Sequence, residues 1–191
     1  MPKIALLSGS LRRESSNTAV IATMRRILEQ QEGCEAVDIA LRSFPPFDED
    51  VERSGGTQEL RAVSALVAGS DALVISSPAY NGYPPGMLKN ALDWLSRPPG
   101  GGVIKGMPVG IASASPGRAG GANVQPRLAE ILTNSGASVV ECATPVAVGN
   151  AVALRTPEGI ITDAAVLADL ERLVADVLAA VGAPATAPVT G

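Results

Sequence analysis

The sequence predicts a three-layer, doubly wound α/β fold, in which helices cover both faces of a five-stranded parallel sheet. Segments with strand and helix patterns alternate five times along the 191 residues. The strand-like segments at Ile4, Leu73 and Val109 are uninterrupted apolar runs, which are typical of parallel strands buried on both faces. A chain of this length fits one domain, which we place at residues 1–182, and we expect the Pro/Ala/Thr-rich tail 183–191 to fray.

The first half of the chain supplies two strands and two helices. Apolar residues recur at spacings of three and four after Asn17, which predicts an amphipathic helix that Gly33 ends. Pro45 and Pro46 cannot lie inside regular elements and therefore predict a loop. In order, we predict a strand at Ile4–Leu7, a helix at Asn17–Gln31, a strand at Glu35–Leu41, a loop at Ser43–Asp50 and a helix at Thr57–Ala68.

The second half supplies the remaining three strands. Right-handed crossovers between five strands fit the flavodoxin-like order 2-1-3-4-5. The predicted elements are a strand at Asp71–Ser77, a loop at Ser77–Pro85, a helix at Gly86–Ser96, a loop at Arg97–Gly106, a strand at Pro108–Ala114, a turn at Ser115–Gly121, a helix at Gln125–Ser135, a strand at Ser138–Thr144 and a helix at Asp163–Val181.

The composition excludes several classes of function. The chain has no histidine, which removes Ser-His-Asp and Cys-His catalysis and histidine metal sites, and we expect no metal. Its 15 basic and 19 acidic residues give a net charge of −4, which offers no electrostatic reason to bind nucleic acid or an anionic membrane. No signal-peptide pattern or membrane span is present, so we expect a cytoplasmic protein with Cys34 and Cys142 as reduced, buried thiols.

In a sheet of this order, the ligand site lies beyond the carboxyl ends of the first and third strands. The loop after the first strand carries four short polar side chains and one arginine just before a helix, whose N-terminal N–H groups and dipole favour an anion. This pattern predicts a cradle for a phosphate monoester, formed by Ser10, Arg12, Ser15, Ser16 and Asn17. The alternative is that Ser15, Ser16 and Asn17 only cap the helix. The loop matches neither GxGxxG nor GxxxxGK[ST], which disfavours a Rossmann dinucleotide site and a P-loop.

Two further loops converge on the same edge. Tyr80 stands beside the Asn81-Gly82 turn, which predicts contact with a flat heteroaromatic ligand, whereas we expect Trp94 to lie in the core. The glycine-rich segment Ser113–Gly121 can approach a ligand closely and direct amides at negative charge, the alternative being a plain flexible turn. We expect three nearby polar residues to serve helix capping and packing: Lys89, Asn90 and Asp93.

Three motifs together resemble the NADPH-dependent FMN reductase family: Gly9-Ser-Leu-Arg12 with Ser15 and Asn17, Pro78-Ala-Tyr-Asn-Gly82, and Pro85-Gly-Met-Leu-Lys-Asn-Ala-Leu-Asp-Trp94. The resemblance extends from Lys3 to about Val181 and implies a bound FMN that takes hydride from NADPH or NADH. It implies that Ser10, Arg12, Ser15 and Asn17 bind the phosphate. It also implies that Pro78, Tyr80, Asn81, Gly82 and the Ala79 backbone lie beside the isoalloxazine ring, with Ser115 near the flavin.

One departure from the family pattern lies at Ala79, where the family usually has glutamate. The backbone at this position remains available to the ring, but a side-chain role in orienting flavin or nicotinamide is lost. The resemblance also implies a homodimer or homotetramer in which a neighbouring subunit closes part of each flavin site. The segment Phe47–Asp50 resembles a loop near that interface.

We therefore predict an FMN-dependent oxidoreductase that takes hydride from NAD(P)H and reduces a flavin, a quinone or a similar small acceptor. No side chain is expected to act as a catalytic acid, because the chemistry takes place at flavin N5. We expect the amides of Ser115–Gly117 to stabilise charge on the reduced flavin. The alternatives are a flavodoxin-type one-electron carrier, against which Arg12 and the modest net charge argue, and a non-enzymatic flavin-binding module.

Overall fold

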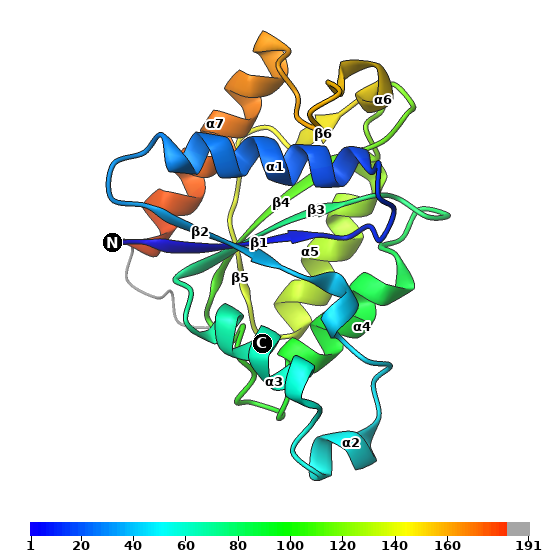
Figure 1. The fold of residues 1–191 in the computed structure, drawn as a ribbon, viewed down its shortest axis with the longest axis vertical. Helices are drawn as coiled ribbons and strands as arrows, with labels where there is room; N and C mark the ends of the chain where they lie inside the picture. The colour runs from blue at the N-terminus through cyan, green and yellow to red at the C-terminus, as the bar shows by residue number, and fades with distance from the viewer. Residues whose placement is uncertain (183–191) are drawn as a thin grey trace.

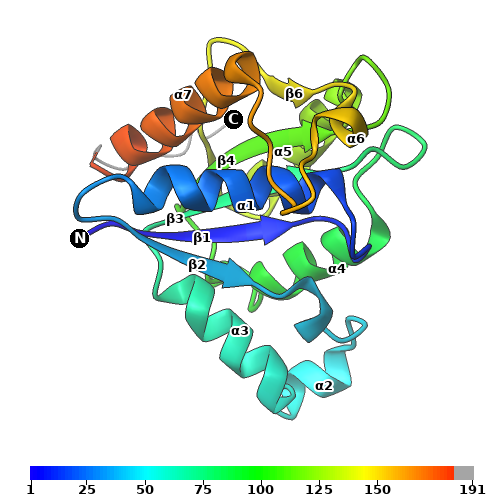
Figure 2. The same ribbon diagram turned by 45° about the horizontal axis from the view of Figure 1, so that its top comes forward.

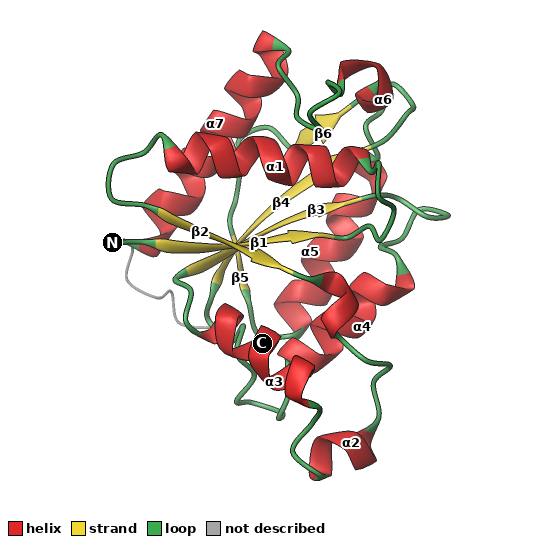
Figure 3. Ribbon diagram, in the orientation of Figure 1, coloured by secondary structure: helices red, strands yellow, loops and turns green. Residues whose placement is uncertain are grey.

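A parallel sheet forms the centre of the protein in the computed structural model, which describes residues 1–182 (Figure 1, Figure 3). The predicted strand order is confirmed, because the strands lie in the order β2-β1-β3-β4-β5. The strands are β1 (Lys3–Ser8), β2 (Glu35–Ile39), β3 (Ala72–Ser77), β4 (Pro108–Ala114), β5 (Ser138–Val139) and β6 (Val146–Val148).

Helices cover both faces of the sheet (Figure 2). Two helices, α1 (Ser16–Glu29) and α7 (Ala164–Val181), pack on one face, and α3 (Gln58–Ala68), α4 (Gly86–Leu95) and α5 (Gln125–Asn134) pack on the other. Neighbouring residues of one strand enter different cores: Leu6 packs with α1 and α7, whereas Leu7 packs with α3 and α4. This two-sided burial explains why the central strands are continuous apolar runs and do not alternate with polar residues.

Side-chain caps fix where three of the long helices begin. Ser15, Thr57 and Asp163 are the N-caps of α1, α3 and α7, and each accepts a hydrogen bond from a backbone N–H of the first turn. Thr57 and Asp163, predicted as the first helical residues, therefore stand one position outside their helices.

The register of the sheet brings three loops to one edge. Ser8 at the end of β1 pairs with Ser76 of β3, and Ser77 of β3 pairs with Ser113 of β4. Because the strands are parallel, the segments that follow them all leave the sheet at its carboxyl edge.

The strand predicted at Ser138–Thr144 is wrong in extent, and the sheet has six strands instead of five. β5 pairs with the start of β4, and β6 pairs with its end at Ala112–Ala114. The Val140 N–H still donates to the Val109 carbonyl over 2.9 Å, after which the chain leaves the sheet. Pro145, which has no N–H to donate to a ladder, immediately precedes its return.

Several short elements were absent from the sequence prediction. Leu41 is buried in a 3₁₀ turn, η1 (Leu41–Ser43), and not in a strand. The predicted loop Ser43–Asp50 runs into a short helix, α2 (Glu49–Arg53), whose cap is Asp48. Elements of one turn leave almost no periodic pattern in a sequence, and the same applies to η2 (Ala122–Val124) and α6 (Ala151–Leu154).

Within residues 1–182, no helix combines the length and the apolar character that crossing a membrane requires. The tail expected to fray, residues 183–191, lies outside the described residues.

Candidate functional site

The first loop at the carboxyl edge ends in the N-terminus of α1. Ser15 Oγ accepts hydrogen bonds from the N–H groups of Asn17 (3.1 Å) and Thr18 (3.4 Å). The amides of residues 13–16 donate no hydrogen bond within residues 1–182. Together with the dipole of a 14-residue helix, these amides create a positive region that can hold an anion.

Ser16 adds a second sign of a ligand at this position. The residue is only 3% exposed, and its hydroxyl finds no hydrogen-bond partner in the described part of the chain. An unsatisfied buried hydroxyl costs about 1–3 kcal/mol. Such a group is expected where a ligand completes the hydrogen bonding.

Arg12 is the cation of the first loop. Its side chain is exposed and forms no ion pair within residues 1–182. Its backbone N–H donates to the Oγ of the half-buried Ser10 over 3.3 Å. The predicted cradle therefore keeps a guanidinium accessible to solvent and to a ligand.

Asn17, predicted to contact the phosphate, also has a structural role that the sequence did not indicate. Its Oδ1 accepts hydrogen bonds from Ser76 Oγ (2.9 Å) and from the Ala114 N–H (3.0 Å), and its Nδ2 donates to the Ala114 carbonyl (3.0 Å). The side chain is buried and therefore joins α1 to the ends of β3 and β4. We interpret Asn17 as a positioning residue that holds the three loops at a fixed separation.

Contacts from distant segments fix the first loop. Arg42 donates to the Leu11 carbonyl over 2.8 Å, and Arg155 forms an ion pair with Glu14 (3.3 Å). Gly9 donates its N–H to the Ser76 carbonyl over 2.8 Å. A Cβ on Gly9 would lie 2.9 Å from a Leu88 methyl group, so the close approach of this loop to β3 requires glycine.

The second loop contains a tight hairpin between Tyr80 and Tyr83. Asn81 and Gly82 have φ values of 53° and 85°, as a type I′ turn requires. The two tyrosines exchange both backbone hydrogen bonds, over 2.9 and 3.0 Å. Both rings are 56% exposed, which leaves them available to a ligand.

Ala79 and Pro78 precede this hairpin and are half-buried. A Cβ built on Gly121 of the third loop would lie 3.7 Å from the Ala79 N and Cβ atoms, so the two loops pack directly against each other. The predicted ring segment, Pro78–Gly82, is thereby placed beside the third loop. Ala79 stands where the family usually has glutamate, and it offers no carboxylate at this contact between the two loops.

The third loop is supported by β6 and the segment that follows it. The Ser115 N–H donates to the Val148 carbonyl (3.1 Å), and the Ser115 carbonyl accepts from the Ala151 N–H (3.1 Å). Ser115 Oγ donates to the Gly117 carbonyl over 3.2 Å. The expectation that the amides of Ser115–Gly117 face a ligand is therefore wrong for Ser115, and Pro116 has no N–H. Of these three residues, only Gly117 has an N–H that donates no hydrogen bond within residues 1–182.

The sequence analysis missed the support that residues 146–151 give to the site. Gly149 lies so close to the third loop that a Cβ would stand 2.2 Å from the Arg118 carbonyl oxygen. Asn150 adopts a φ of 51° and donates its N–H to the Gly117 carbonyl over 3.2 Å. The Gly149-Asn150 pair is a turn signal that would have identified this close approach.

The third motif of the sequence serves packing. Trp94 is 5% exposed and donates its indole N–H to the Pro45 carbonyl over 2.7 Å. Asn90 Oδ1 accepts the Phe47 N–H (2.7 Å), and Asn90 Nδ2 donates to the same Pro45 carbonyl (2.8 Å). Lys89 forms an ion pair with Asp93 along α4. These residues therefore fix the segment that precedes α2.

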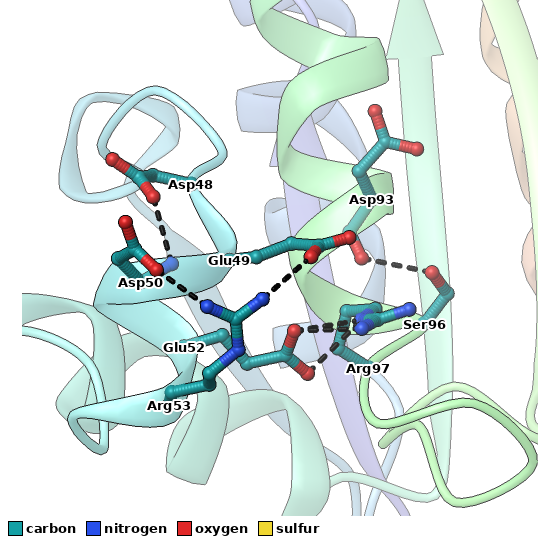
Figure 4. A network of polar contacts seen from close by, with 8 residues as sticks. All are labelled: Asp48, Glu49, Asp50, Glu52, Arg53, Asp93, Ser96 and Arg97. Carbon is teal, nitrogen blue, oxygen red and sulfur yellow. Dashed lines mark hydrogen bonds and ion pairs between the residues drawn. The ribbon is translucent and has the colours of Figure 1, made fainter.

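One ion pair joins α2 to the chain just beyond the end of α4 (Figure 4). Arg97 donates to both carboxylate oxygens of Glu52, over distances of 2.7–3.0 Å. This hydrogen bonding lowers the pKa of Glu52 and raises the pKa of Arg97. The Arg97 guanidinium also lies 5.7 Å from the centroid of the Phe47 ring.

The two cysteines are free thiols, as expected, but they are half-buried where we expected buried side chains. No disulfide joins them. Cys142 lines a hollow of about 270 Å³ where the chain leaves the sheet between β5 and β6. Burial, with a smaller contribution from a hydrogen bond to Asp176, raises the pKa of Cys142 to about 11. The thiol is therefore neutral at physiological pH and is a poor nucleophile.

Comparison with known proteins gives consistent results. A family model described as NADPH-dependent FMN reductase matches residues 2–151. A 2-hydroxy-1,4-benzoquinone reductase of Burkholderia sp. is 38% identical over 126 residues, which cover 66% of this chain and 67% of that protein. A quinone reductase of Escherichia coli is 37% identical over 131 residues, which cover 68% and 69% of the two chains.

Among solved structures, the flavoenzyme FerB of Paracoccus denitrificans, an NAD(P)H:(acceptor) oxidoreductase, is similar to this chain over most of its length. The TM-score is 0.82 at 26% identity, with coverage of 95% of this chain and 97% of that one. A mutant flavodoxin of Pseudomonas aeruginosa shares the fold at 19% identity, with a TM-score of 0.56 and coverage of 95% and 99%.

Proposed function

This chain belongs to the NADPH-dependent FMN reductase family, and we propose that it uses the loops at the carboxyl edge of its sheet to transfer reducing equivalents from NAD(P)H through FMN to a quinone. It is an NAD(P)H-dependent flavin oxidoreductase. The names of the Burkholderia and Escherichia coli relatives support a quinone as the acceptor.

The observation that carries the proposal is the unfilled hydrogen-bonding capacity at the start of α1. The free amides of residues 13–16, the orphaned hydroxyl of Ser16 and the exposed guanidinium of Arg12 match the donors that a phosphate monoester needs. The residues present therefore fit FMN, and we assign its phosphate to Ser10, Arg12, Ser15 and Ser16. Asn17 contributes by holding the loop in place.

The second and third loops are proposed to hold the flavin ring. The backbone of Pro78–Gly82 lies at the switch point of the sheet, as a ring-binding segment should. Bound FMN supplies the hydride-accepting chemistry, which requires no histidine or catalytic acid from the protein. Within the segment Ser115–Gly117, the Gly117 amide is the one that can donate to negative charge on the flavin, while Ser115 holds the loop against β6.

The chain is further proposed to act in the cytoplasm as a homodimer or homotetramer. None of the residues of α2 is buried, and the segment Phe47–Asp50 leads into this helix at the margin of the molecule (Figure 2). Only Val51 and Glu52 of this helix are half-buried, so its other side chains are available to a neighbouring subunit. Light scattering after size-exclusion chromatography tests this assembly: a monomer at micromolar concentration would contradict it.

An anaerobic titration tests the function. The purified protein is saturated with FMN, reduced stepwise with NADPH or NADH and then mixed with 1,4-benzoquinone, while absorbance near the flavin maximum is recorded. We expect the absorbance to fall with the donor and to recover with the quinone. A protein that takes up no FMN would contradict the proposal, as would bound FMN that neither donor reduces.

A further inference from the structure

The carboxyl edge of the sheet carries more positive charge than an FMN phosphate requires. Within residues 1–182, five arginines form neither an ion pair nor a side-chain hydrogen bond. One of them, Arg26, lies in the last turn of α1, away from this edge. The other four lie on the loops or the first helical turn that follow β1 and β4: Arg12, Arg13, Arg118 and Arg127. A protein of net charge −4 thus presents unpaired cations at its proposed site.

Arg127 has the best-defined environment of the four. Its guanidinium carbon lies 5.2 Å from the centroid of the Tyr83 ring, a separation typical of a cation–π contact. Tyr83 belongs to the rigid Asn81-Gly82 hairpin. Because directly opposed residues of an antiparallel pair point to the same face, Tyr80 and Tyr83 present their rings on one side of this hairpin.

The backbone that carries Arg127 is also held firmly. Gln125, the first residue of α5, donates its Nε2 to Ser113 Oγ (2.9 Å) and to the Val146 carbonyl (2.8 Å). These bonds fix the start of α5 to the end of β4 and to β6. Arg127 is therefore held by its helix on one side and by the Tyr83 ring on the other.

The position of Arg127 opposes the helix dipole. A cation in the first turn is repelled by the positive end of the helix, and the first turn of α5 contains no acidic residue to offset it. An arginine at such a position, exposed and without a carboxylate partner within residues 1–182, is well suited to bind an anion.

We propose that Arg127 and Tyr83 form a second anion subsite, which recognises the 2′-phosphate of NADPH and so favours NADPH over NADH. This assignment rests on the proposed function. In that function the nicotinamide must reach the flavin ring beside Pro78–Gly82, which is part of the same hairpin. The adenosine half of NADPH carries an adenine, which can stack on an exposed tyrosine ring. It also carries a phosphate monoester, which can accept hydrogen bonds from a guanidinium group. Arg118, in the loop that precedes η2 and α5, is likewise exposed and forms no ion pair within residues 1–182.

The first test measures binding without turnover. The FMN-saturated protein is titrated calorimetrically with 2′-AMP and with 5′-AMP. We expect the wild type to bind 2′-AMP more tightly, and Arg127→Ala to weaken 2′-AMP binding about 10- to 100-fold, the scale of a charge-assisted hydrogen bond. The matched control Arg26→Ala should bind as the wild type does. Equal affinities of the wild type and Arg127→Ala for 2′-AMP would overturn the proposal.

The second test measures donor preference. The ratio of kcat/KM for NADPH to that for NADH should fall about 10- to 100-fold in Arg127→Ala, and Arg127→Lys should restore part of it. Tyr83→Leu should lower the ratio, whereas Tyr83→Phe, which keeps the ring, should not. If Arg127→Ala lowered kcat/KM equally for NADPH and NADH, the 2′-phosphate assignment would be wrong. Arg127 would then contact the pyrophosphate, which both donors share.

The two proposals fail in different ways. If the protein binds no FMN, the proposed function is wrong, and this inference falls with it. If FMN binds and both donors reduce it, but Arg127→Ala leaves the NADPH/NADH ratio unchanged, only the second anion subsite is wrong.

Discussion

Single side chains at the carboxyl edge of the sheet have distinct roles, although the sequence presents them as one polar cluster. Arg12 faces solvent without a partner in the described chain, while Asn17 is buried and hydrogen-bonded through both Oδ1 and Nδ2. The first is therefore available to a ligand, and the second determines the positions of the strands around it. Substitutions at the two residues should have separable effects on binding and on stability.

Arg12→Ala should weaken FMN binding and leave the fold intact. The side chain forms no contact that holds the loop, so the expected loss is that of one charge-assisted hydrogen bond, about 1.5–3 kcal/mol, or a roughly 10- to 150-fold rise in the FMN Kd. Quenching of flavin fluorescence measures the Kd. Arg26→Ala, at the other end of α1, serves as the control. Equal FMN Kd values for Arg12→Ala and the wild type would contradict the assignment of Arg12 to the phosphate site.

Asn17→Leu should destabilise the protein. The leucine has a similar size but leaves Ser76 Oγ and the backbone of Ala114 without their partners in a buried position. We expect a loss of about 2–5 kcal/mol in the free energy of unfolding, measured by urea denaturation. Asn134→Ala on the exposed end of α5 should change it by less than about 0.5 kcal/mol. A similarly small change for Asn17→Leu would show that the hydrogen bonds of Asn17 contribute little to the free energy of unfolding.

The residue types of the site could be predicted from the sequence. Which of their donors and acceptors already have a partner within the protein could not. The serines, the arginine and the helix start are local features. The partners of Asn17 are not, because Ser76 lies 59 positions away and Ala114 lies 97 positions away. For the same reason, no local pattern indicates that the Ser115 N–H donates to the Val148 carbonyl. Only the folded chain shows which donors remain for a ligand.

At the scale of elements, one ion pair, Arg97–Glu52, joins α2 to the chain just beyond the end of α4. Arg97 lowers the pKa of Glu52 below its ordinary value of 4.5, so this carboxylate is charged more readily in the folded state than in the unfolded one. A group with a depressed folded-state pKa stabilises the protein above its unfolded pKa, and this contribution disappears as the pH falls through the folded-state value.

Glu52→Gln should therefore lower stability at pH 7, and the difference from the wild type should shrink as the pH falls below about 4.5. Urea midpoints at pH 7 and at pH 3.5 measure this change. Glu49→Gln on the same helix is the matched control, because its partner Arg53 is exposed and the pair is screened by solvent. A difference that is the same at both pH values would contradict the assigned ion pair.

Long elements were predictable because each one buries an apolar face. The central strands and the three capped helices lie within one or two residues of their predicted bounds. β6 and α6 were missed because they are only three and four residues long. Their positions follow from contacts with the third loop and not from a pattern of their own.

At the scale of the whole molecule, the net charge is negative, whereas the unpaired charge at the carboxyl edge of the sheet is positive. A total of −4 argues against anionic partners in general, yet four of the five arginines without partners in the described chain lie in the segments that follow β1 and β4. The fold thus places positive charge and a helix N-terminus together in a protein of negative net charge. Anion binding should accordingly weaken as ionic strength rises.

The central claim is that the start of α1 holds the phosphate of FMN. Comparing the affinities of the apoprotein for FMN and for riboflavin, which has the same ring system but no phosphate, tests it most directly. We predict that FMN binds at least about 100-fold more tightly, because the amides of residues 13–16, Ser16 and Arg12 lose their ligand in riboflavin. Equal affinities for the two flavins would contradict the account.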